Sequence, residues 1–177
     1  MVFAGAGVWL FLDRDSGGDV NASTRKVELP DKLGDLHASK NPEDDVLIDK
    51  TRKDYKNVLG AAVDFRAYTS GSGEGDTGGD GDETRVSVQA VRADLPFSVY
   101  ASSEDWKYTY TKVRDDMWCA SLTSEDYETN EQETHPYNCQ RTDNGLLVDV
   151  YIPSPDDSSL TQEDLVKLTD QAYDAVK

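Results

Sequence analysis

The chain has 177 residues, and its 35 acidic residues against 18 basic residues give a formal net charge of −17 at neutral pH. This charge repels nucleic-acid phosphates, so the composition argues against a nucleic-acid partner. The length is sufficient for one domain with a modest hydrophobic core rather than for two domains.

An uncharged apolar run occupies residues 2–12. It is shorter than the roughly 20 residues that a membrane-spanning helix needs, and it lacks the basic leader of a signal peptide. We interpret residues 1–12 as part of an N-terminal membrane anchor or signal segment; the alternative is an ordinary buried strand or helix. Residues 13–29 then form an acidic tether, and residues 30–177 form one extracytoplasmic domain.

A first helix is predicted over residues 42–59. Asn41 is a favourable N-cap, and Pro42 suits the first helical position. Gly60 suits the C-terminal cap. We expect this helix to have a structural role.

Several strands are predicted after this helix. Apolar and polar residues alternate over residues 61–68 and again over residues 85–90, which predicts an antiparallel pair joined by a long loop at 70–83. Asn144 and Gly145 predict a tight hairpin turn, because both accept the positive φ that such a turn needs. Further strands are expected at residues 95–101, 108–113, 117–122, 137–141 and 146–152.

A final helix is predicted over residues 160–176, where apolar residues recur at helical spacing. Thr161 and Asp164 form a variant of the capping box at its start. The order of elements predicts an α+β domain whose largely antiparallel sheet packs against an N-terminal and a C-terminal helix, in the manner of an α/β/α sandwich.

Cys119 and Cys139 are the two cysteines of the chain, and both lie in segments with strand character. In a chain with features of export, two thiols are most simply one disulfide. A redox pair would more often be CxxC beside a helix start, and a zinc site would need further ligands at short spacing.

The second half of the chain, from about residue 105, carries a Trp-Cys pair at 118–119, the sequence YNCQR at 137–141, the strand LLVDVYI and the final helix. With the N-terminal apolar run and the acidic tether, this pattern resembles small membrane-anchored or exported actinobacterial proteins that have no assigned activity. The order of elements also resembles the PsbP-like fold. The resemblance implies no catalytic motif.

Two segments are candidates for binding. Residues 70–83 contain three carboxylates that are weak candidates for calcium ligands, Asp76, Asp80 and Asp82. Their spacing matches a calcium loop poorly, and a disordered connection is the simpler interpretation. Four aromatic residues could line a surface for a ligand or partner, although packing in the core is the simpler interpretation for them; they are Trp106, Tyr108, Tyr110 and Trp118.

Three functions follow in order of preference. The first is a membrane-tethered, extracytoplasmic, non-catalytic domain that binds an unknown protein partner, as an accessory to a cell-envelope complex. The second is a module that binds a cation or a small ligand. The third is a hydrolase with carboxylate acid/base chemistry, which would need two acids with separated pKa values in one cleft. We expect no catalytic residues, and no cofactor unless calcium binds.

Overall fold

The described part of the chain folds around one antiparallel sheet. The computed structural model describes residues 23–40, 48–50, 52–54, 57, 60–70, 84–100, 102, 106–125 and 132–177. Within these ranges eight strands pair in the order β1-β2-β3-β4-β8-β7-β6-β5, and every neighbouring pair is antiparallel. The strands are β1 (Lys32–Leu33), β2 (Leu36–Ala38), β3 (Val63–Thr69), β4 (Arg85–Val91), β5 (Trp106–Arg114), β6 (Met117–Glu125), β7 (Gln132–Asp143) and β8 (Leu146–Tyr151).

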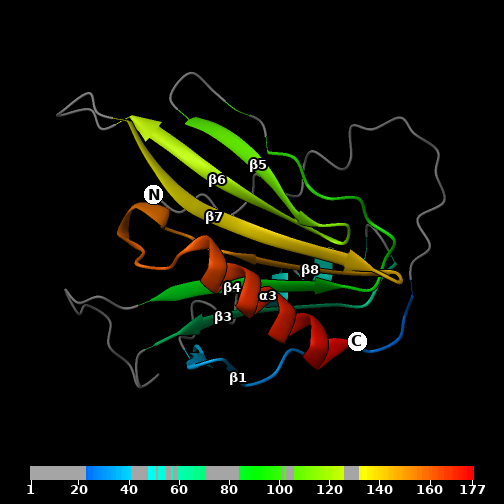
Figure 1. Cartoon of the computed structure of the whole chain (residues 1–177). Helices are drawn as coiled ribbons and strands as arrows, with labels where there is room; N and C mark the ends of the chain where they lie inside the picture. The colour runs from blue at the N-terminus through cyan, green and yellow to red at the C-terminus, as the bar shows by residue number, and fades with distance from the viewer. Residues whose placement is uncertain are drawn as a thin grey trace.

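A C-terminal helix, α3 (Gln162–Val176), lies across one face of the sheet (Figure 1). A short 3-10 helix, η1 (Pro155–Asp157), precedes it. The predicted capping box is confirmed: the Asp164 amide donates to Thr161 Oγ1 at 3.2 Å, and the Thr161 amide donates to Asp164 Oδ2 at 3.0 Å. The sheet and this helix confirm the predicted α+β class.

β3 and β4 are the pair predicted on either side of the acidic segment. They pair without interruption from Val63 opposite Val91 to Thr69 opposite Arg85. Both faces of these strands are largely buried, whereas the sequence alternation predicts one buried face. The connection between them, residues 71–83, lies outside the described residues, so the disordered loop stays a prediction.

The hairpin between β7 and β8 is confirmed. Asn144 and Gly145 have φ values of 51° and 71° in the turn, as the residue types predict. β7 is longer than expected, because its pairing with β6 begins at Gln132. Together β5, β6, β7 and β8 form a run of consecutive antiparallel hairpins, which places β8 next to β4 in the middle of the sheet.

The prediction of a strand at residues 95–101 is wrong for its described residues. Residues 92–100 and 102, here called the crossover segment, run irregularly from β4 to β5. Pro96 has no amide hydrogen for a strand ladder. Side chains of the sheet bind this segment instead: the Ser98 amide donates to Gln140 Oε1 at 2.7 Å, and Thr142 Oγ1 donates to the Leu95 carbonyl at 3.2 Å.

The two faces of the sheet are covered by different elements. On the face covered by α3, here called the α3 face, apolar side chains of alternate residues of β4 and β8 pack with the helix. On the opposite face, here called the crossover face, the crossover segment packs on the next residues of the same strands. The α3 face includes Val86, Val88, Val148, Val150, Leu165 and Leu168, and the crossover face includes Val91, Ala93, Leu95 and Leu147.

The folded domain includes residues that the sequence places in the tether. Ser23 is bonded through its backbone to both Arg92 and Ala62, at 2.9 Å in each case. Val27 and Leu29 are buried. Residues 48–50, 52–54 and 57 are helical, within the helix predicted at 42–59. No helix in the described ranges is long and apolar enough to cross a membrane, and the apolar run at 2–12 lies outside these ranges.

Candidate functional site

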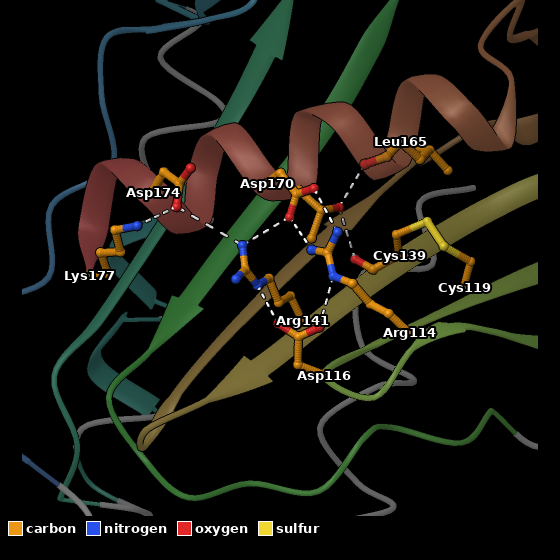
Figure 2. Close-up of polar contacts among 10 residues, drawn as sticks. Arg114, Asp116, Cys119, Cys139, Arg141, Leu165, Asp170, Asp174 and Lys177 are labelled. Carbon is orange, nitrogen blue, oxygen red and sulfur yellow. Dashed lines mark hydrogen bonds and ion pairs between the residues drawn. A yellow bond between two sulfur atoms is a disulfide. The ribbon is translucent and has the colours of Figure 1, made fainter.

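The two cysteines form the predicted disulfide. Cys119 of β6 and Cys139 of β7 lie directly opposite each other, with their Cα atoms 4.0 Å apart. Both are buried beneath α3 (Figure 2). Thr169 Oγ1 of the helix donates to the Leu165 carbonyl at 2.7 Å and to the Cys139 carbonyl at 3.4 Å. This position indicates a structural crosslink between two strands.

A closed ring of four charged side chains connects α3 to the end of β5, the turn between β5 and β6, and β7 (Figure 2). Asp116 accepts from Arg114 Nε and from Arg141 Nε, both at 2.8 Å. Asp170 of α3 accepts from Arg141 Nη1 at 2.9 Å and from Arg114 Nη1 at 3.0 Å. Arg141 also lies over the Tyr173 ring, 4.0 Å from its centroid.

The charges of this ring balance one another. Although burial opposes it, hydrogen bonds from Arg114 and Arg141 lower the pKa of the Asp116 carboxyl. A carboxylate held ionised between two guanidinium groups is a poor proton donor or acceptor near neutral pH. The ring therefore has the properties of a structural connection between helix and sheet rather than of a catalytic site.

Tyrosine side chains gather on the crossover face. Tyr100 of the crossover segment contacts Tyr108 of β5 and Tyr137 of β7, with ring centroids 5.2 Å and 5.1 Å apart. The Tyr108 and Tyr137 rings complete the triangle at 5.3 Å. Tyr137 has no partner in the pairing of β6 with β7, since the register shifts there. Such a bulge redirects a side chain, which here reaches the other two rings.

The four aromatic residues predicted as one surface separate into different environments. Tyr108 and Tyr110 both contact Tyr100: the Tyr110 hydroxyl bonds the Tyr100 backbone, accepting from its amide at 2.5 Å. Trp118 packs against Phe97, with ring centroids 6.0 Å apart. Trp106 is 43% exposed.

Asp149 lies in the middle of the crossover face and was not among the predicted site residues. Asn138 Nδ2 donates to one of its oxygens at 2.9 Å, and Gln140 Nε2 donates to the other at 3.3 Å. The Tyr100 hydroxyl is a further partner of the carboxylate. Burial raises the pKa of Asp149 to about 6, against the effect of these hydrogen bonds.

The sequence did contain a signal for Asp149. It interrupts LLVDVYI, the most strand-like run of the chain, and a strand buried on both faces is usually apolar throughout. Tyr100 and Tyr137 had no comparable signal, because a crossover and a bulge bring them together. The alternation of apolar and polar residues along a strand predicts neither the crossover nor the bulge.

The buried carboxylates do not form the acid pair that a hydrolase would need. Asp149 lies opposite Gln89, which lies opposite Phe65, so these three residues share the crossover face. Asp64, the other buried acid in the described ranges, lies opposite Ala90 on the α3 face. Because a sheet separates the two groups, they cannot act on one substrate.

The predicted metal ligands belong to the connection between β3 and β4. Asp76, Asp80 and Asp82 lie outside the described residues. Within the part of the chain that the structure describes, no group of three His, Cys, Asp or Glu side chains is arranged to hold a metal ion. A surface pocket of about 200 Å³ is lined by Arg85, Pro153, Ser154, Asp157 and Ser158. It is smaller than the roughly 300 Å³ at which small-molecule sites begin.

The exposed apolar side chains concentrate at one edge of the sheet. In the described ranges the large hydrophobic residues that stay exposed are Val99 at 65%, Trp106 at 43% and Val113 at 39%. Trp106 and Val113 belong to β5, the last strand of the sheet, and Val99 belongs to the crossover segment that leads to it. This edge is the strongest candidate for a contact surface.

No family model, curated protein or solved structure matches the chain. The resemblance to exported actinobacterial proteins and to the PsbP-like fold therefore stays a prediction.

Proposed function

We propose that this chain is a membrane-tethered, extracytoplasmic domain that binds a protein partner through the β5 edge, defined as β5 together with Val99. The observation that carries this proposal is the concentration of exposed apolar side chains on that edge. An apolar surface is unfavourable in water unless a partner covers it, and aromatic residues such as Trp106 are typical of protein interfaces.

The environment of the other candidate residues agrees with a binding role. The disulfide and the ring of charges are structural, and the two buried acids face opposite sides of the sheet. The disulfide also fits an oxidising compartment outside the cytoplasm. The apolar run at 2–12 supports the tether by its composition.

Site-specific crosslinking in the native host tests the proposed surface. A photoreactive phenylalanine analogue replaces Trp106 or Val99 in the full chain, and Lys167, an exposed residue of α3, is the matched control. We expect the same discrete protein adduct from the first two positions and none from the third. Equal labelling from all three positions, or no adduct, would contradict a partner at the β5 edge.

A fractionation experiment tests the tether separately. We expect the full chain to stay with membranes after alkaline extraction and to be digested by protease added outside intact cells. Leu10→Asp with Phe11→Asp should release it, because charges in an apolar segment disfavour insertion. If the unsubstituted chain is already soluble, the proposed tether is wrong, and the proposal for the contact surface is unaffected.

A further inference from the structure

The two edges of the sheet differ in their capacity to accept another strand. β1 has two residues, whereas β5 has nine. Short edge strands are one way in which proteins prevent further pairing, and a long exposed edge strand is a template for it. All described side chains of β5 are exposed or half-buried.

The backbone of β5 points hydrogen-bonding groups away from the sheet. The Tyr108 amide donates to Ser102 Oγ at 3.1 Å rather than to β6. Because backbone groups in a strand point alternately to its two sides, the amides and carbonyls of Tyr110 and Lys112 also point outward. No hydrogen bond from the described residues reaches these outward groups of Tyr110 and Lys112.

The charge of β5 is opposite to that of the whole chain. Residues 106–114 contain Lys107, Lys112 and Arg114 and no acidic residue, although the chain has a net charge of −17. Arg114 belongs to the ring of charges, and Lys112 forms an exposed pair with Asp115 at 2.8 Å. Exposed pairs of this kind contribute little and exchange readily, so Lys107 and Lys112 can meet carboxylates of a partner.

Apolar side chains of the strand lie on the crossover face and at its C-terminal end. β5 alternates, so that Trp106 and Tyr110 lie on the crossover face while Thr109 and Thr111 lie on the α3 face. Val99 is 65% exposed beside this strand, and Val113 is exposed at its end. An added strand would find apolar contacts as well as backbone partners.

From these observations, and resting on the function proposed above, we propose that β5 accepts an extended acidic segment of the partner protein as a ninth strand of the sheet. Main-chain hydrogen bonds to Tyr110 and Lys112 supply the pairing, and the two lysines select acidic side chains. A second copy of this chain is the disfavoured occupant, because pairing β5 with β5 would place basic strands side by side and join two molecules of charge −17.

Peptide binding to the full chain tests this inference. Lys107 and Lys112 lie on opposite faces of β5, so the probe is a blocked peptide of repeated Glu-Glu-Val-Val, which presents glutamate on both faces. The matching lysine–valine and N-methylated glutamate–valine peptides are its controls. We expect saturable binding of the first probe, with an affinity about tenfold or more above that of either control, since each removes one of the two interactions. Equal affinity for the acidic and basic peptides would overturn the inference.

Variants locate the peptide on the strand. Lys107→Glu with Lys112→Glu should weaken binding of the acidic probe by about tenfold or more and improve binding of the basic one. Lys167→Glu with Lys177→Glu, a matched pair of charge reversals on α3, should change either affinity by less than about threefold. Similar losses from both pairs would indicate general electrostatics and overturn the assignment to β5.

The outcomes distinguish this inference from the function on which it depends. A partner crosslinked at Trp106, together with no binding of the acidic probe, overturns strand addition and keeps the contact surface. Concentration-dependent dimers that the acidic probe does not disrupt and that Trp106→Ala abolishes would assign the edge to a second copy. No adduct at Trp106 and no peptide binding would overturn both.

Discussion

The two faces of the sheet are buried by different chemistry. Beneath α3 the interior is apolar and includes a disulfide, and a ring of charged groups lies beside it. The buried acid of this face, Asp64, is ion-paired with Arg52. On the crossover face an acid, Asp149, lies buried among amides and tyrosine rings. Apolar burial stabilises a fold without fixing the exact position of an element, whereas a satisfied polar group fixes that position and costs desolvation. The α3 face therefore supplies stability, and the crossover face fixes the segment that leads to β5.

The largest predicted effect is on the α3 face. Leu165 is completely buried there, and Leu165→Ala should lower the free energy of unfolding by about 4 kcal/mol, because a cavity adds to the lost burial. Urea unfolding measures the change. Val113→Ala removes exposed methyl groups from β5 and should cost less than about 0.5 kcal/mol. Equal losses would contradict the assignment of stability to the α3 face.

Removing the crosslink of the α3 face should have the next largest effect. Cys119→Ala with Cys139→Ala opens a disulfide across a sequence separation of 20 residues, which should cost about 3 kcal/mol by freeing the unfolded chain. Chemical unfolding with the wild type kept oxidised measures it. Intact mass before and after reduction and alkylation is the control that the disulfide forms. A loss near zero would show that the strands alone define the pairing.

The contribution of the crossover face to the free energy of unfolding should depend on pH. The pKa of Asp149 in the folded chain is raised to about 6, so the folded state binds this proton more tightly than the unfolded state. Its contribution to the free energy of unfolding is present near pH 4 and is lost as pH rises through 6, by up to about 3 kcal/mol. Relative to the wild type, Asp149→Asn should gain this amount between pH 4 and pH 7.

Urea unfolding at several pH values measures that gain. Asp94→Asn, which alters an exposed acid on the crossover segment, is the matched control and should show no comparable trend. The side chains that face Asp149 are those of Asn138, Gln140 and Tyr100, and the side chains of Tyr151 and Tyr137 lie nearby. Parallel pH curves for Asp149→Asn and the wild type would show that Asp149 is ionised without penalty.

The smallest predicted effect concerns the ring of charges. Asp170→Asn leaves two guanidinium groups with one carboxylate and should cost about 1 kcal/mol at low salt, and less in 1 M salt, because the ring is partly exposed. Thermal unfolding at the two salt concentrations measures both values. Glu163→Gln breaks an exposed pair with Lys167 and should have a smaller effect at either salt concentration. Identical effects would mean that the ring acts as separate pairs.

Local rules correctly predicted several elements. The box of Thr161 and Asp164 depends on residues three positions apart, and the turn at Asn144 and Gly145 depends on adjacent residues. The β3–β4 pair followed from alternation in two segments. The disulfide followed from there being two cysteines in strand-like segments. Each of these depends on residues near in sequence or on a choice among very few partners.

The candidate site was predicted only in part, because most of its contacts join residues that are far apart in the sequence. Tyr108 and Tyr110 were identified, but their shared partner Tyr100 lies in a segment that the sequence favours as a strand and that Pro96 and the anchoring side chains keep irregular. A bulge directs Tyr137 toward them. Segments far apart in the sequence bury Asp149 together. Its apolar sequence neighbours therefore suggest that it is buried, but they do not identify its hydrogen-bond partners.

The sequence by itself determined the acidic composition, the class of fold, the ends of α3, one hairpin turn and the pairing of the cysteines, because each depends on short-range patterns or simple counting. The tertiary structure decided the order of the strands. That order places β5 at an exposed edge, separates Asp64 from Asp149 and closes the ring of charges. These features depend on contacts between residues far apart in the chain, which local propensity does not encode.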